Sequence, residues 1–186
     1  MACTYSSRDG QVASGSAAVR ASQANLALVS TPGPYAFVDA FDALESGASV
    51  LLFSDNVPLE EEIALKDYAR DRGLLVMGPG AGTAMIAGVG LGFANVVKPG
   101  RVGVVAAAGT GAQEVMSLLA RWGVGVSQVL GLGGRDLADD VGGRMALPAI
   151  SALRDDPGTD VILLVSKPPA AAVAAKVLAA AGDTPL

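Results

Sequence analysis

The chain has 186 residues, a formal net charge of −5 and a hydrophobic share of 51%. This length suffices for one large or two small domains with a buried core. The acidic balance and the lack of a Lys/Arg stripe argue against nucleic acid or a polybasic membrane surface as a partner. No apolar stretch approaches the ~18–20 residues of a membrane-spanning helix.

The cysteine and histidine content excludes several kinds of site from this chain. Cys3 is the single cysteine and histidine is absent. An internal disulfide is therefore impossible, and no secretory signal pattern opens the chain, so we expect a cytoplasmic protein. The lack of histidine excludes histidine-ligated metal sites, Ser-His triads and phosphohistidine chemistry within this chain. We expect no metal site, and the sequence identifies no catalytic residue.

The first half of the chain predicts a parallel α/β unit. Residues 1–24 are rich in Ser, Ala, Gly and Gln without a sustained period, and they predict a poorly ordered lead-in. From residue 25 the apolar runs are continuous rather than alternating, which is typical of parallel strands covered on both faces. Strands are expected at 26–29, 50–53 and 74–77, and helices at 34–45 and between Pro58 and Gly73.

A second unit follows an interruption. Residues 78–97 are glycine-rich and uncharged, and Lys98-Pro99-Gly100 marks the expected boundary, which gives units at 25–98 and 99–186. The second unit stops after three strands, so we expect it to be truncated. Its strands are expected at 101–106, 126–130 and 161–165, and its helices at 110–122, 147–154 and 168–181.

The turn at 107–114 carries the strongest local signal for a ligand. A strand runs into glycines, and a helix is expected to begin with Thr110 as N-cap and Gln113 at capping-box spacing. Helix-start amides and the helix dipole favour anions, and glycines let an anion approach the backbone. This predicts phosphate binding at Gly109, Thr110 and Gly111. The alternative is an ordinary strand-to-helix turn that needs glycine for tight packing.

The loop after the next strand supplies a positive charge. Arg135 follows a glycine turn at the carboxyl end of a strand, the edge where open α/β sheets bind ligands. A guanidinium binds phosphate or carboxylate through two parallel hydrogen bonds. The alternative is an ion pair of Arg135 with Asp136 or Asp139 on a solvated loop.

Further candidates lie at other strand ends. Helix capping is the alternative for residues 54–56, loop flexibility for 78–83, and an ordinary surface position for Lys167. The glycine repeat at 88–92 does not open a helix after a strand, so it is discounted as a dinucleotide site. The additional candidates for the ligand-binding edge are Ser54, Asp55, Asn56, Gly78, Pro79, Gly82, Thr83, Asp136 and Lys167.

Five segments taken together resemble a known family. They occur in order at residues 54–63, 73–79, 109–114, 131–137 and 165–169. They closely resemble the FdrA family, which is similar to the α subunit of succinyl-CoA synthetase and other nucleoside-diphosphate-forming acyl-CoA synthetases. The resemblance covers nearly all of the chain from Asn25 to about Leu178. It implies a partial Rossmann-like CoA-binding unit at 25–98 and a flavodoxin-like, succinyl-CoA synthetase-like unit at 99–186.

The resemblance also implies an activity. In the synthetases the helix after a Ser-Gly-Thr turn points at a phosphorylated histidine, and residues 109–111 occupy the matching place. An acyl or carbamoyl phosphate is therefore the implied ligand, with CoA or a nucleotide as cofactor. The implied enzymes are a succinyl-CoA ligase-like synthetase or a subunit of an oxamate carbamoyltransferase in allantoin degradation.

Departures from the family pattern leave two hypotheses open. The synthetase histidine has no counterpart, its glutamate partner is replaced around Ser166 and Lys167, and Gly80-Ala81 stand where FdrA-like sequences carry Asp-Cys. The chain is either an enzyme that is incomplete alone, or a non-catalytic binding and assembly module. In both cases we expect a partner subunit or a homo-oligomer.

Overall fold

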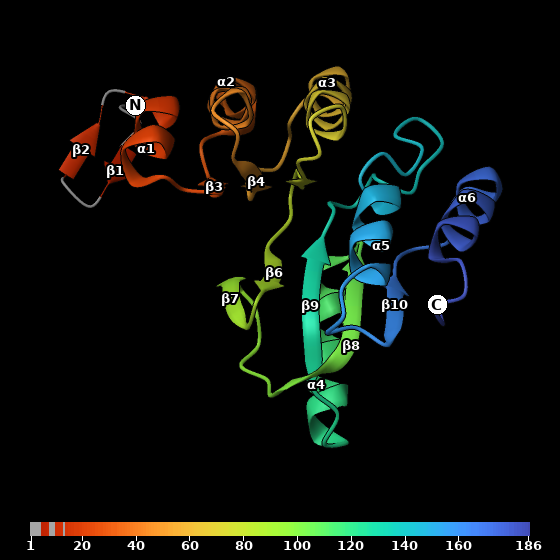
Figure 1. Cartoon of the computed structure of the whole chain (residues 1–186). Coiled ribbons are helices and arrows are strands. Elements are labelled where there is room, and N and C mark those ends of the chain that lie inside the picture. Colours follow the sequence, from red (N-terminus) through yellow and green to blue (C-terminus); the bar gives the residue numbers. More distant parts are fainter. Residues whose placement is uncertain (1–4, 8–9, 13) are drawn as a thin grey trace. The chain divides into compact units, whose positions relative to one another are not determined.

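A computed structural model of the chain describes residues 5–7, 10–12 and 14–186. The chain divides into two compact units between Gly80 and Ala81 (Figure 1). Each unit contains a sheet of parallel strands connected by helices, as the sequence predicts. The parallel α/β fold class is therefore confirmed.

The first unit is built on a short parallel sheet with strand order β3-β4-β5. Strands β1 and β2 form a separate antiparallel pair. The elements are β1 (Tyr5–Ser7), β2 (Gly10–Val12), α1 (Gly15–Ser22), β3 (Leu26–Val29), α2 (Gly33–Glu45), β4 (Ser49–Leu52), α3 (Leu59–Arg70) and β5 (Val76–Met77).

Helix α1 lies where the sequence predicted a poorly ordered lead-in. Ser14 caps the helix, because its side-chain oxygen accepts a hydrogen bond from the amide of Ala17 at 3.2 Å. The side chain of Val19 is buried, which stabilises the position of the helix. The structure therefore differs from the prediction over these residues, and the part of the prediction at 1–4, 8–9 and 13 lies outside the described residues.

Helices α2 and α3 lie side by side on one face of the first sheet (Figure 1). This follows from the sequential strand order, because right-handed crossovers that advance in one direction keep their helices on one side. Phe41 of α2 joins the two helices, since its ring centroid lies 5.8 Å from that of Phe37 and 4.6 Å from that of Tyr68.

The second unit is a five-stranded sheet with the order β10-β8-β9-β6-β7. Strands β8, β9 and β10 are parallel, and β6 runs antiparallel to both β7 and β9. The elements are β6 (Thr83–Ile86), β7 (Val89–Gly92), β8 (Pro99–Ala106), α4 (Gly109–Arg121), β9 (Val126–Gly131), α5 (Ala146–Arg154), β10 (Val161–Val165) and α6 (Ala171–Ala181).

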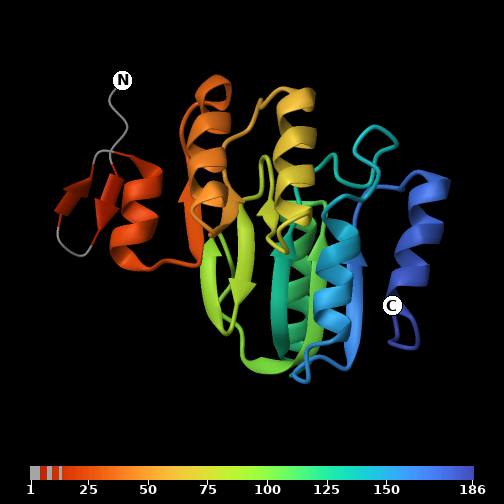
Figure 2. The ribbon, with the colours of Figure 1, turned by 45° about the horizontal axis from the view of Figure 1, so that its top comes forward.

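Helices cover both faces of this second sheet. From β8 the chain crosses to β9 on one side, and from β9 it crosses back over β8 to reach β10. Right-handed crossovers in opposite directions put α4 and α5 on opposite faces, as Figures 1 and 2 show. The core under α4 consists of Met85, Val104, Ala106, Ala112, Met116, Leu119, Val126 and Val129.

The hairpin of β6 and β7 was not predicted, and it moves the boundary between the units. The sequence predicted the boundary at residues 98 and 99, but Met85 of β6 pairs with Val129 of β9 and so adds the hairpin to the second sheet. Its two-residue turn has positive φ at Ala87 (50°) and Gly88 (79°). Alanine is not typical of the first position, so the turn residues do not indicate a hairpin.

Asp156 stabilises the turn between α5 and β10. Its carboxylate accepts hydrogen bonds from the amide of Gly158 and the hydroxyl of Thr159, both at 2.9 Å. The Gly158 amide, followed by the Thr159 hydroxyl, lowers the pKa of Asp156 below its ordinary value of 3.8. A lowered folded-state pKa contributes stability above the unfolded pKa, and this stability is lost as the pH falls through the folded pKa.

We expect Asp156→Asn to lower the free energy of unfolding by about 1 kcal/mol at neutral pH, because a charge-assisted acceptor is lost. The difference from the wild type should shrink as the pH falls below 3.8 and should be lost once the pH is below the lowered folded-state pKa, where the carboxyl is protonated in the folded protein as well. Urea denaturation across the acid range measures this. Asp155→Asn, which removes an exposed ion pair with Arg154, is the control. An equal loss for both variants, or a pH-independent loss for Asp156→Asn, would contradict the prediction.

The described residues include neither a membrane-spanning helix nor a cluster of metal ligands. No helix among them combines the length and apolar character that crossing a membrane requires. No group of three or more His, Cys, Asp or Glu side chains among them is arranged to hold a metal ion.

Candidate functional site

The loops that follow the three parallel strands of the second unit meet at one edge of its sheet. The amide of Leu132, just after β9, donates to the carbonyl of Ala106 at 2.7 Å. The amide of Ala107, just after β8, donates to the carbonyl of Val165 at the end of β10 at 2.8 Å. The loops after β8, β9 and β10 are therefore neighbours.

Helix α4 begins without a side-chain cap. Its N-cap residue is Ala108, in an extended conformation, and Gly109 is the first helical residue. The predicted capping box at Thr110 is therefore wrong. The side-chain amide of Gln113 does not return to the helix start but donates to the hydroxyl of Thr83, at 2.8 Å.

The first three amides of α4 precede the first helical hydrogen bond. That bond runs from the amide of Ala112 to the carbonyl of Ala108 at 2.9 Å. The amides of Gly109, Thr110 and Gly111 have no acceptor within the helix, as in the first turn of any α-helix. They also lie at the positive end of the helix dipole. This end of α4 is therefore suited to an anion.

The start of α4 is open rather than blocked. Thr110 is exposed, and Gly109 and Gly111 are partly exposed. A Cβ atom at Gly109 would meet nothing within 4 Å, whereas one at Gly111 would lie 2.9 Å from the Cγ1 atom of Val165. Glycine at 111 thus allows the helix to pack against the end of β10, and glycine at 109 leaves space for a ligand.

The loop after β9 lies at the same edge of the sheet. The strand order reverses at β8, whose two neighbours are β9 and β10, and open α/β sheets bind ligands at the carboxyl edge near such a reversal. Gly134 lies here, because a Cβ atom on it would be 4.0 Å from the carbonyl oxygen of Ala107. Arg135 comes next in the chain and is exposed.

Asp136 has a structural role. It is fully buried (0% exposed), its Oδ1 atom accepts from the amide of Met145 at 3.2 Å, and its Oδ2 atom accepts from the amide of Ala146 at 2.8 Å. The carboxylate therefore caps the start of α5 from the loop after β9. Asp136 was a candidate for ligand binding from sequence, but the structure gives its carboxylate this structural role.

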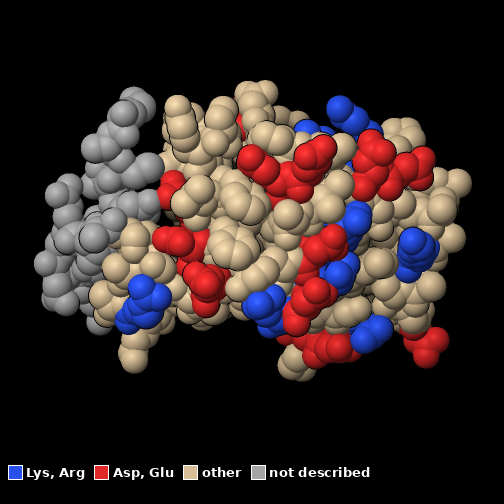
Figure 3. All heavy atoms as spheres, turned by 90° about the horizontal axis from the view of Figure 1, so that it is seen from above, with Lys and Arg blue, Asp and Glu red and all other residues tan. Residues whose placement is uncertain are grey.

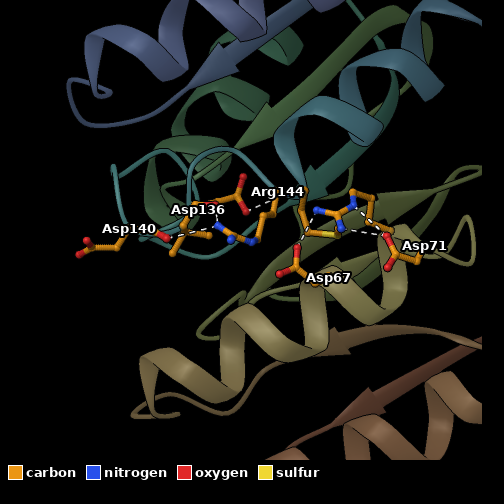
Figure 4. A network of polar contacts seen from close by, with 8 residues as sticks. Asp67, Asp71, Asp136, Asp140 and Arg144 are labelled. Atoms are coloured by element: carbon orange, nitrogen blue, oxygen red, sulfur yellow. Dashed lines mark hydrogen bonds and ion pairs between the residues drawn. The ribbon is translucent and has the colours of Figure 1, made fainter.

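The same loop is stabilised further by Arg144. Its guanidinium donates to the backbone carbonyls of Asp140 and Val141. Figure 4 shows Asp136, Asp140 and Arg144 in this loop. The figure also labels Asp67 and Asp71 of α3, which form ion pairs with Arg70 at 2.6 and 2.8 Å within the first unit.

The remaining second-unit candidates have different surroundings. Lys167 is exposed after β10, where its carbonyl accepts the hydroxyl of Ser166. Gly82 is partly exposed, and its carbonyl accepts the amide of Phe93 at 2.7 Å. Thr83 is buried (1% exposed), so its side chain is not accessible at the surface.

The first-unit candidates lie at the carboxyl ends of β4 and β5. Asp55 and Asn56 are exposed, whereas Ser54 is buried and its hydroxyl donates to the carbonyl of Val29 at 3.5 Å. Gly78 lies against the backbone of β4, since a Cβ atom on it would be 2.3 Å from a carbonyl oxygen, and Pro79 is buried next to it. These residues form a carboxyl edge of their own in the first sheet.

Charges of both signs are spread over the face that Figure 3 draws. On this face Asp and Glu side chains lie among Lys and Arg side chains, without a broad basic area. Any anion at the second-unit edge must therefore be held by local donors rather than by a wide positive field.

One family model matches part of the chain. The family model described as CoA binding domain matches residues 97–184. The match falls on the second unit, whereas the resemblance in the sequence implied the CoA-binding unit at 25–98.

The chain also has relatives in sequence. It is 51% identical over 164 residues to the uncharacterized protein YahF of Escherichia coli (strain K12), a match that covers 88% of this chain and 32% of YahF. It is 28% identical over 146 residues to the succinate–CoA ligase [ADP-forming] subunit alpha of Methanothermobacter thermautotrophicus, covering 77% of this chain and 48% of that subunit. The chain thus spans about a third to a half of these relatives.

Solved structures confirm the fold. The apo form of a dinucleotide-forming acetyl-coenzyme A synthetase from Ca. Korarchaeum cryptofilum matches with a TM-score of 0.65 at 19% identity, over 84% of this chain and 34% of that one. The fold is therefore that of succinyl-CoA synthetase-like α/β proteins, and the chain is similar in sequence to their α subunits.

Proposed function

We propose that the chain is an acyl-CoA ligase-like module whose second unit binds a phosphate-bearing ligand at the start of α4. The observation that carries this proposal is the open set of amides at Gly109, Thr110 and Gly111, at the carboxyl edge of the second sheet. The similarity to succinate–CoA ligase α subunits and the match to a CoA binding domain support it.

The ligand that we propose is an acyl phosphate, or the carbamoyl phosphate that the FdrA resemblance implies. The helix-start amides would bind its phosphoryl oxygens, and Arg135 and Lys167 would neutralise its charge. When an acceptor attacks the carbonyl carbon, the new bond forms to its sulfur or nitrogen and its proton passes to the departing phosphate. The bond from the carbonyl carbon to the phosphate oxygen breaks, and the phosphate leaves with the electron pair. Aimed amides stabilise the charge that develops on that oxygen. The acceptor would be the thiol of CoA or the nitrogen of oxamate.

The chain is proposed to work with a partner subunit or a second copy of itself. It contains no histidine, so a phosphohistidine relay would need an imidazole from elsewhere. It also spans only about half of the relatives whose names give an activity. A non-catalytic binding and assembly module is therefore the second candidate function. Turnover that requires added partner chains, with ligand binding by the chain alone, would distinguish it from a complete enzyme.

A ligand screen tests the proposal directly. We expect inorganic phosphate, carbamoyl phosphate, CoA or ADP to raise the melting temperature of the chain, because a ligand that binds only the folded state stabilises it. Oxamate, which has no phosphate, is the control and should have little effect alone. Titration calorimetry then gives each dissociation constant. The absence of any shift with all phosphate-bearing compounds would overturn the proposal.

A further inference from the structure

The first turn of α4 is held by a contact from another part of the sheet. Its N-cap residue, Ala108, provides no side-chain hydrogen bond. Gln113, one turn into the helix, donates instead to the hydroxyl of Thr83 at 2.8 Å. The two residues are far apart in the sequence, so this hydrogen bond connects the start of α4 to β6.

Thr83 contacts two of the segments that lead to the candidate site, helix α4 and the end of β9. Its side chain is buried (1% exposed) and it is the first residue of β6. A Cβ atom on Gly131 would lie only 2.4 Å from the carbonyl oxygen of Thr83. The backbone of β6 therefore packs directly against the end of β9. Gly131 leads into the loop that contains Gly134 and Arg135. Thr83 therefore contacts both α4 and the end of β9.

We infer that the Gln113–Thr83 hydrogen bond is a positioning contact that sets the affinity of the α4 amides for phosphate. The inference rests on the proposed function. Amides bind an anion well only when their direction is fixed before the ligand arrives, because otherwise the ligand must order them. In the absence of a cap at Ala108, the Gln113 side chain supplies this constraint one turn into the helix. Thr83 and Gln113 act through the backbone and do not contact the ligand themselves.

Three variants and a matched control test the inference. Thr83→Val keeps the shape of the side chain but removes the hydroxyl, Thr83→Ser restores a hydroxyl, and Gln113→Met removes the donor from the other side. Ser117→Ala is the control, because it removes a hydrogen bond of similar kind from Asn95 to the opposite half of α4, at 3.0 Å. The dissociation constant for inorganic phosphate is measured by calorimetry, and stability by urea denaturation.

We expect Thr83→Val and Gln113→Met to weaken phosphate binding by about three- to tenfold, the worth of one hydrogen bond. Thr83→Ser should recover wild-type affinity to within about twofold, and Ser117→Ala should leave it unchanged although it too lowers stability. Unchanged affinity in Thr83→Val, or an equal loss in Ser117→Ala, would overturn the inference. If Thr83→Val does not fold, Gln113→Met decides by the same criteria.

A second measurement separates this inference from the proposed function. Amide ¹⁵N order parameters at residues 109–111 are measured without ligand in all four variants. Thr83→Val and Gln113→Met should lower them, and Thr83→Ser and Ser117→Ala should not. If the wild type binds no phosphate, the proposed function fails, and unchanged order parameters would then overturn the positioning role as well.

Discussion

Asp136→Ala is expected to lower the free energy of unfolding of the second unit by about 3 kcal/mol. The carboxylate is fully buried and accepts from two backbone amides, those of Met145 and Ala146, at the start of α5. Its removal leaves both amides without this acceptor inside the protein, and each unsatisfied buried donor costs about 1–3 kcal/mol. Urea denaturation monitored by circular dichroism measures the loss.

Two further variants make this prediction sharper. Asp136→Asn keeps one acceptor oxygen but brings an NH₂ group toward the other amide, so an intermediate loss is expected. Asp139→Ala is the matched control, because Asp139 is an exposed acidic residue of the same loop and should stay within about 0.5 kcal/mol of the wild type. If Asp136→Ala is as stable as Asp139→Ala, the capping role is refuted.

Gly109→Pro is expected to weaken binding of phosphate or carbamoyl phosphate by about ten- to a hundredfold. Proline has no N–H group, so one of the three helix-start donors is lost, and a hydrogen bond to a charged group is worth about 1.5–3 kcal/mol. The fold should tolerate the change. Proline is favoured at the first helical position, Ala108 before it is already extended (φ −152°, ψ 102°), and the space around Gly109 is open.

The control for this prediction is Gly109→Ala. Alanine adds the same Cβ atom but keeps the amide, so it separates the loss of a donor from the loss of space. We expect its dissociation constant, measured by calorimetry, to stay within about threefold of the wild type. Both variants should unfold at or above the wild-type urea midpoint, because each restricts the unfolded chain. Equal affinities of the proline and alanine variants would show that the amide of Gly109 is not a donor to the ligand.

Much of the fold could be predicted from the sequence because buried parallel strands are continuous apolar runs. The strand at residues 161–165 was predicted with both of its ends, and other strands and helices within a few residues. The β6–β7 hairpin could not be predicted. Its turn residue Ala87 adopts a positive φ, which is uncommon for alanine, and its strands are uncharged.

The candidate site was predictable only as a set of strand ends. The glycine turn at 109–111 and the glycines before Arg135 can be recognised from the local sequence, because a ligand can approach the backbone closely only at glycine. The hydrogen-bond partners of the polar side chains cannot be recognised in this way. Gln113 has the spacing of a capping box, yet its side chain donates to the hydroxyl of Thr83. The sequence around Asp136 predicts a loop, yet its carboxylate caps a helix that begins several residues later. Such contacts depend on which segments the sheet brings together.

The cap provided by Asp136 has a consequence for local unfolding. Because one carboxylate joins the glycine loop after β9 to the first turn of α5, neither segment can open while the other keeps all of its hydrogen bonds. The two segments should therefore exchange their amide hydrogens as one cooperative unit. A ligand that holds the loop closed would then slow exchange along α5, on the face of the sheet opposite to α4.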